Sequence, residues 1–293
     1  MTEATGGNAQ GPERRSRFEL IRMPVPAGAA APALDLMTRH ASVRSFRSDP
    51  LPAGALDRIL VAAQSAPTSS NLQAYSIIVV SEPARRERLA ELCGGQAMVR
   101  ECPAFLVFCP DIHRLRHVCR RQNRPFQARF LEMFLLASMD AALAAENALL
   151  AAESLGLGAC FCGSIRNNPQ EVIDLLRLPE GTYALTGLAL GQVRRQSEIK
   201  PRLPLRAIVH REHYSDQPME DAVAEYDRVM AETRTYDGRH VSIAGEPPAP
   251  DDRFYGWAEH TARRLTRPET IAASASLREN LRRVLEANGW SFA

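Results

Sequence analysis

The sequence contains little cysteine. Its 293 residues include six cysteines, and no two of them have the C-x-x-C spacing. Six cysteines are too few for a disulfide scaffold in a chain of this length, and without C-x-x-C a thioredoxin-like redox centre is not expected. Reduced thiols in a cytoplasmic protein are the simplest interpretation.

An excess of charge of one sign is also lacking, since the net charge is only +2. Binding to a phosphate backbone usually needs a concentrated basic face. We therefore expect no nucleic-acid partner.

Long uninterrupted apolar runs are the third absence. Residues 1–32 contain no apolar stretch of signal-peptide length, and their Gly, Pro, Ala and Arg content predicts a flexible leader. The most apolar stretch, residues 131–157, is interrupted by Asp140, Glu146 and Glu153, which makes membrane insertion unfavourable. No membrane span is predicted.

The remaining pattern alternates helices and strands, which predicts an α/β or α+β sandwich. Residues 126–155 are apolar nearly all round and predict a central buried helix. After about residue 215, charged helices flank a Gly- and Pro-rich linker at 237–252. We expect a leader at 1–32, a core at 33–215 and a C-terminal arm at 216–293. Apart from the 126–155 helix, the core is predicted to contain helices at 34–40, 52–64, 84–92 and 169–178, and strands at 76–80 (buried), 104–109, 159–162 and 184–191.

Three motifs suggest other chemistry, and each has a simpler explanation. The glycines of GLGACFCG (156–163) close a helix and open a strand, whereas a Rossmann turn follows a strand and opens a helix. Ser69 and Ser70 lack the G-x-S-x-G elbow of a hydrolase, and serines before a strand usually make turns and caps. A zinc-like set of Cys109, His113, His117 and Cys119 fits no established finger and is surrounded by arginines, so a basic surface helix is favoured.

Two basic segments suggest a bound anion. RHASVRSFRSDPLP (39–52) gathers a histidine, serines and arginines, and KPRLP places Lys200 and Arg202 on a proline-stiffened loop. Either segment alone is best explained as a solvated loop. Together with the Ser/Thr loop at 68–70 and the Gly163-Ser164 strand end, they supply what flavin mononucleotide (FMN) needs: cations for phosphate, small polar groups for ribityl hydroxyls and backbone N–H groups for the ring edge.

The segments RHASVRSF, SAPTSSNLQAYSIIVV, CGGQ, AALAAENALLAAESLGLGACFCGSIRNNP, LGQV and KPRLP follow one another between about residues 35 and 215. This series resembles the flavin-dependent nitroreductase family, and most of all its NADPH-preferring branch of nitroreductases and flavin reductases. LEANGW near the C-terminus continues the pattern. The resemblance implies an α+β fold with a central sheet flanked by helices, and an interlocked homodimer with an extended C-terminal arm and FMN at two interface sites.

The resemblance also implies site residues. Asn71 lies where the substrate cavity is expected, and Arg253 and Arg278 are the expected partners of the NADPH 2′-phosphate. No protein nucleophile or base is implied. The residues expected to bind FMN are His40, Ala41, Ser42, Arg44, Thr68, Ser69, Ser70, Gln96, Cys162, Gly163, Ser164, Lys200 and Arg202.

Three departures from the family pattern concern the site. Ala41 stands where arginine is common, Phe161 where tyrosine is frequent, and Asn71 where an aromatic residue is common. The implied reaction is ping-pong, with hydride passing from NADPH to the flavin and then to a small-molecule acceptor such as a nitroaromatic, a quinone or a flavin. The alternative is a non-catalytic flavin-binding or flavin-sensing homologue.

Overall fold

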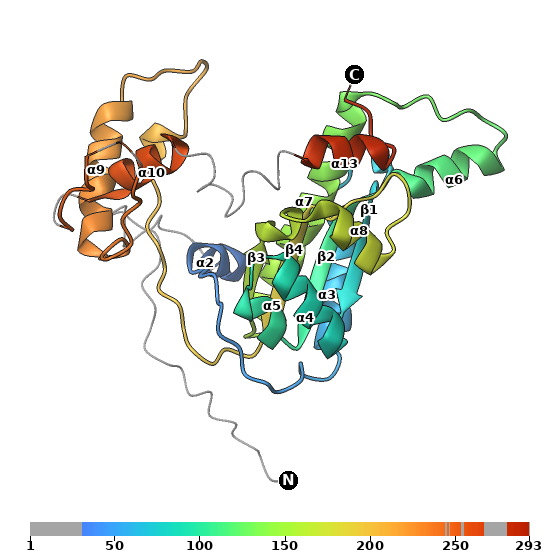
Figure 1. Cartoon of the computed structure of the whole chain (residues 1–293), viewed down its shortest axis with the longest axis horizontal. Coiled ribbons are helices and arrows are strands. Elements are labelled where there is room, and N and C mark those ends of the chain that lie inside the picture. Colours follow the sequence, from blue (N-terminus) through green and yellow to red (C-terminus); the bar gives the residue numbers. More distant parts are fainter. Residues whose placement is uncertain (1–30, 244, 246, 253–254, 267–279, 293) are drawn as a thin grey trace, which may run out of the picture. The chain divides into compact units, whose positions relative to one another are not determined.

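The computed structural model describes residues 31–243, 245, 247–252, 255–266 and 280–292, and the chain divides into two compact units (Figure 1). The first unit comprises the described parts of residues up to 40, together with 198–240 and 249–260. The second comprises 41–197, 241–248 and the described part of 261–293. The units are interleaved along the chain, whereas the predicted division into core and arm at residue 215 was a linear one.

A four-stranded antiparallel sheet forms the centre of the second unit. Its strands are β1 (Tyr75–Val80), β2 (Ala104–Pro110), β3 (Gly158–Cys162) and β4 (Thr186–Gly191), in the order β1-β2-β4-β3. These are the four predicted strands, and the α+β fold class is confirmed. The prediction that β1 is buried was wrong in part. Because β1 is an edge strand with one neighbour, only its two ends are buried, whereas β2 is buried throughout.

Helices cover both faces of this sheet (Figure 1). On one face, α3 (Ala55–Gln64) and α7 (Leu131–Ser154) pack against Leu106 and Phe108 of β2. On the other, α4 (Pro83–Leu92), α5 (Ala97–Glu101) and α8 (Pro169–Leu176) pack in the cluster that contains Phe105 and Val107. Successive side chains of a strand point to opposite faces, which explains how β2 contributes to both clusters.

The long helix α7 begins at Leu131, not at residue 126 as predicted, because Phe130 has an extended backbone with φ −153°. By length and composition α7 could cross a membrane, yet nearly half of its most apolar stretch is buried in this unit, as in the core helix of a folded domain. The expectation that α7 is buried all round was wrong. Its side chains at four-residue spacing are exposed, namely Leu131, Leu135, Met139 and Leu143.

The first unit is helical, with α2 (Pro32–Thr38), α9 (Met219–Glu232) and the beginning of α10 (Trp257–Thr266). Tyr226 of α9 stacks edge-on against Trp257, with 5.2 Å between ring centroids, and its hydroxyl donates to the Pro201 carbonyl at 3.2 Å. Two further helices, α6 (His113–Arg121) and α13 (Leu281–Ala287), belong to the second unit. After α13, Trp290 is buried and stacks edge-on against Phe134 of α7 at 5.4 Å.

Candidate functional site

The segment 41–44 runs alongside β3, where the Val43 amide donates to the Ala159 carbonyl at 2.9 Å. Ala41 and Val43 are buried, Ser42 is half-buried and Arg44 is exposed. Burial raises the pKa of the Cys160 thiol on β3, while the charge of Arg44 and a hydrogen bond with Ser42 lower it. Ser42 and Arg44 therefore lie beside β3, and Ala41 is a core residue.

The loop at residues 68–73 contains unusual backbone conformations. It includes the short 3-10 helix η1 (Ser69–Asn71), and Ser70, Asn71 and Gln73 have φ of +49°, +54° and +50°. Non-glycine residues in this left-handed region are uncommon and tend to cluster at functional sites. Thr68 is half-buried and residues 69–73 are exposed, so the loop presents polar side chains to solvent.

Two charged side chains hold this loop. Asp140 of α7 is buried, with 1% of its surface exposed; its Oδ1 accepts from the Ser69 amide at 3.0 Å, and its Oδ2 from the Ala74 amide at 3.1 Å. Arg114 of α6 donates through Nη1 to the carbonyls of Gln73 and Tyr75, at 3.0 and 3.1 Å. Both ends of the loop are thereby tied to helices.

The end of β3 leads into a 3-10 turn, η2 (Gly163–Arg166). Cys162 is buried, with its Sγ 3.6 Å from the Ser164 hydroxyl. A hydrogen bond with the Cys93 thiol lowers the pKa of Cys162 and raises that of Cys93, and the Ser164 and Ile165 backbones also lower it. The Arg166 guanidinium donates to the Leu185 carbonyl. A Cβ added at Gly163 would lie 3.4 Å from that guanidinium, so Arg166 lies beside this half-buried turn.

The predicted glutamine lies at the start of a helix. Gly94 and Gly95, with φ of +79° and +76°, end α4 as expected, and the Gly95 amide donates to the Ala90 carbonyl at 2.8 Å. Gln96 follows as the residue before α5, half-buried, with its carbonyl accepting from the Val99 amide.

The predicted FMN-binding residues are divided between the two units. Ser42, Arg44, Gln96, the 68–70 loop and the β3 end all belong to the second unit, whereas His40, Lys200 and Arg202 belong to the first. Arg202 is exposed, and its Nη1 donates to the carbonyls of Lys200 and Pro201 at 3.2 and 3.1 Å. Arg253 and Arg278 lie outside the described residues. The FMN-binding and NADPH-binding assignments remain predictions.

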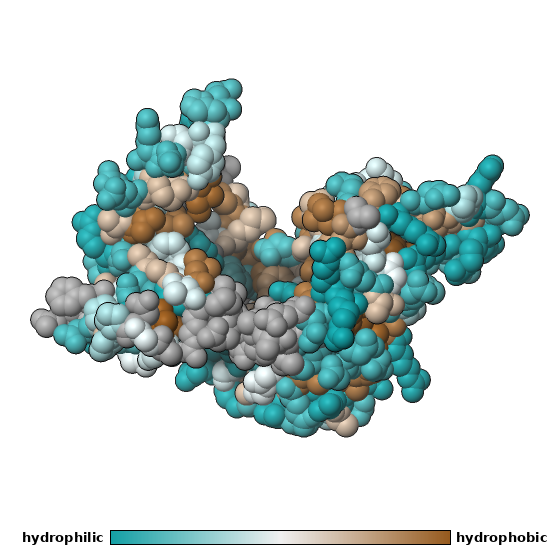
Figure 2. Space-filling view, turned by 45° about the horizontal axis from the view of Figure 1, so that its top comes forward, coloured by the Kyte–Doolittle hydropathy of each residue, from teal (hydrophilic) through white to brown (hydrophobic). Residues whose placement is uncertain are grey.

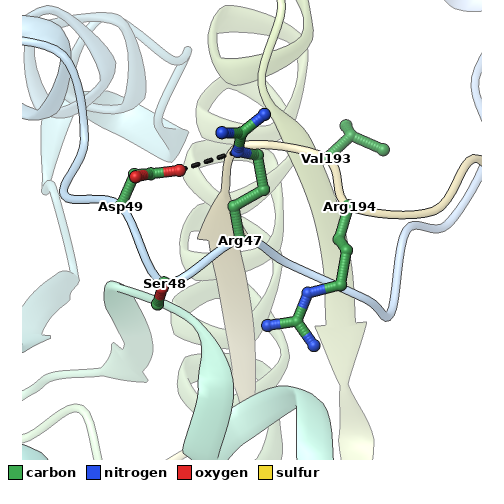
Figure 3. A pocket seen from close by; sticks show the side chains of 5 residues that line it. All are labelled: Arg47, Ser48, Asp49, Val193 and Arg194. Carbon is green, nitrogen blue, oxygen red and sulfur yellow. Dashed lines mark hydrogen bonds and ion pairs between the residues drawn. The ribbon is translucent and has the colours of Figure 1, made fainter.

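An open pocket of about 350 Å³ lies beside the bridge between Phe46 and Val193 (Figure 3). Arg47 donates through Nε to Asp49 at 2.7 Å, and Arg194 lies 3.7 Å from Glu101. Each arginine thus has a carboxylate partner. The pocket is lined by Arg47, Ser48, Asp49, Val193 and Arg194.

Across the described ranges, no three His, Cys, Asp or Glu side chains are grouped so as to hold a metal ion. Cys109 is buried in β2, whereas His113, His117 and Cys119 lie on α6, which has no buried residue. The interpretation of this segment as a basic surface helix is confirmed.

Sequence reasoning missed Asp140, Arg114 and Arg166 as neighbours of the site. A signal for Asp140 was present, because a carboxylate in the middle of an apolar helix must find partners when it is buried. Arg114 and Arg166 had no such signal, since the carbonyls to which they donate are distant in sequence or lie in irregular backbone.

Comparison with known proteins covers nearly all of the described chain. Residues 37–192 match the model of the nitroreductase family, and residues 200–293 match that of the nitroreductase family C-terminal domain. The chain is 39% identical to the NAD(P)H FMN reductase of Bacillus subtilis, over 67% of this chain and 80% of that protein. It is 40% identical to the oxygen-insensitive NADPH nitroreductase of Salmonella typhimurium, over 69% of this chain and 82% of that protein.

Solved structures show the same fold. The hypothetical oxidoreductase YcnD from Bacillus subtilis superposes with a TM-score of 0.77 at 32% identity, covering 89% of this chain and 98% of that one. The NADPH:FMN oxidoreductase from Vibrio harveyi, in complex with NAD+, superposes with a TM-score of 0.69 at 31% identity, covering 84% and 97%.

Proposed function

Because the chain belongs to the nitroreductase family, we propose that it is an FMN-dependent oxidoreductase that takes reducing equivalents from NADPH. The observation that carries this proposal is that polar groups lie on the segments that match the family. Arg44 lies beside β3, the loop at 69–71 has positive φ at Ser70 and Asn71, and Gly163 and Ser164 follow the end of β3. Relatives named as NADPH-dependent flavin reductases and nitroreductases support the choice of cofactor and reductant.

The donor set fits FMN. Arg44 and Ser42 would hold the phosphate together with His40, Lys200 and Arg202, since cations and hydroxyl groups make the strongest contacts to phosphate oxygens. Thr68, Ser69 and Ser70 would bind ribityl hydroxyls, and Gly163 and Ser164 would present backbone N–H groups to the ring edge. Ala41, being buried, would add no phosphate contact of its own.

When bound, FMN accepts and donates hydride, so the protein needs no nucleophile. The chain's part is to bind and orient the flavin, and the backbone N–H groups of Gly163 and Ser164 at the ring edge would stabilise the negative charge that develops when the flavin is reduced. The acceptors proposed are nitroaromatics, quinones or free flavin.

Purified protein is expected to be yellow, with an oxidised-flavin spectrum. Anaerobic addition of NADPH should bleach the absorbance, and a quinone or nitroarene should restore it. NADH titrated in parallel measures the nicotinamide preference. Colourless protein that takes up no FMN would remove the proposed function, and bound FMN that NADPH does not bleach would instead favour the non-catalytic flavin-binding alternative.

Members of the nitroreductase family are generally homodimers, and we propose a homodimer for this chain. Apolar side chains reach the surface in several places among hydrophilic ones (Figure 2), and α7 exposes a stripe of them. Met139 is 54% exposed and Leu135 45%. A second copy would cover this stripe. We also propose that the protein is cytoplasmic and has no nucleic-acid or membrane partner.

Replacing Leu135 and Met139 together by arginine is expected to shift the protein from dimer to monomer, because two charges would be buried at the interface. Sedimentation velocity at micromolar concentration measures this shift. Val118→Arg is the control, since Val118 is 50% exposed on α6 and lies outside the stripe. A double variant that stays dimeric would show that the stripe is not the interface.

A further inference from the structure

The 68–73 loop makes few hydrogen bonds among its own residues. Ser70, Asn71 and Gln73 all have positive φ, and left-handed conformations of non-glycine residues persist only where surrounding structure enforces them. Within the loop, the Leu72 amide donates to the Ser69 carbonyl at 2.9 Å. Gln73 donates to the carbonyl and side-chain oxygens of Asn71 at 3.4 and 3.3 Å, both long distances for such bonds. Shorter bonds to both ends of the loop come from residues outside it.

Asp140 of α7 makes two of these bonds. Its two carboxylate oxygens accept one amide each, from Ser69 at the start of the loop and from Ala74 just after it. A single side chain therefore fixes the distance between the two loop ends. Because Asp140 is 1% exposed and Ala74 is fully buried, loss of the carboxylate would leave the Ala74 amide as a buried donor without this partner.

Arg114 supplies a second anchor from the side of α6. Besides its two bonds to the Gln73 and Tyr75 carbonyls, its Nη2 donates to the Ser76 hydroxyl at 2.7 Å. Ser76 in turn donates to Asp111 Oδ2 at 2.5 Å, and Asp111 lies 3.4 Å from the guanidinium. This network orients Arg114 toward the loop.

We propose that Asp140 and Arg114 are positioning residues, which hold Ser69, Ser70 and Asn71 in the conformation that binds the flavin and its acceptor. The proposal rests on the proposed function of this site. Neither residue is assigned a contact with flavin; both act through the loop backbone. A purely structural role would lower stability and leave the affinity of folded protein unchanged.

The test uses the full-length protein with Asp140→Asn and Arg114→Ala. Asparagine keeps one acceptor for the two amides, and the Arg114 side chain is 50% exposed, so its removal leaves no cavity in the core. Controls remove the same charge from an exposed position on the same helix: Glu146→Gln on α7 and Arg120→Ala on α6. The Kd for FMN is measured on apoprotein by quenching of flavin fluorescence, and kcat and KM are measured at saturating FMN.

Each positioning variant is expected to raise the Kd for FMN by about 10-fold, since at least one bond to a charged group is lost. The KM for the acceptor should also rise, with kcat at saturating FMN within about 3-fold of wild type, while both controls match wild type. If the Asp140 variant does not fold, the Arg114 variant decides. Folded variants with unchanged Kd and KM and only a lowered Tm would overturn the proposal. Wild-type protein that never binds FMN would overturn the proposed function and this inference together.

Discussion

Alanine at both Lys200 and Arg202 is expected to weaken FMN binding by about 10²-fold or more. A hydrogen bond to a charged group contributes about 1.5–3 kcal/mol, and two such bonds to one phosphate would be lost. The loop that carries them is held in place independently of their side chains, because the Pro201 carbonyl accepts from the Tyr226 hydroxyl at 3.2 Å. Lys200 and Arg202 are therefore presented from an ordered loop. No other residue of 200–204 carries a positive charge that could replace them.

The measurement is the Kd of apoprotein for FMN, compared with that for riboflavin. Riboflavin lacks the phosphate, so its affinity should fall much less in the double variant. Arg206→Ala with Arg211→Ala is the matched control, because it removes two exposed charges from the same unit. Unchanged FMN affinity in the Lys200/Arg202 variant, or an equal loss in the control, would place the phosphate elsewhere.

The elements of the core could be predicted from sequence because each has a local pattern. Compact β-branched or apolar runs mark β1, β2 and β4, and paired glycines mark the end of α4. The predictions that were wrong concern burial, which depends on the neighbouring elements. The run at β1 is as apolar as a buried strand, but its place at the sheet edge is fixed by the strand order. Likewise, the periodicity of α7 does not distinguish the apolar face that stays exposed from the apolar face that packs on the sheet.

The candidate site shows the same limit. Ser42, Arg44 and the Gly163-Ser164 turn could be proposed from the sequence because their residue types suit an anion and a ring edge. The anchors of the 68–73 loop were not, because Ser69 and Asp140 are separated by 71 residues and Gln73 and Arg114 by 41. Such contacts depend on where α7 packs on the sheet and on where α6 follows β2, and they leave no local trace in the sequence. Only the cost of a buried carboxylate pointed to Asp140.

The strand end that carries Cys162 depends on a glycine in the neighbouring strand. Gly187 of β4 is paired with Val107 of β2 on one side and Cys162 of β3 on the other. A Cβ at this position would lie 2.0 Å from Cζ of Phe105, whose ring is fully buried in the core. The missing side chain leaves the space that this ring fills.

Gly187→Ala is therefore expected to lower the free energy of unfolding by about 3 kcal/mol or more, at the upper end of overpacking effects, which corresponds to a Tm lower by roughly 6–12 °C. Differential scanning calorimetry measures the change. Phe105→Leu removes the clashing ring carbons, so the double variant should be destabilised by less than the sum of the single variants. Additive losses would show that Phe105 is not the obstacle. Because Gly187 pairs directly with Cys162, protein that still folds should also bind FMN more weakly, which links the packing of the central sheet to the geometry of the site.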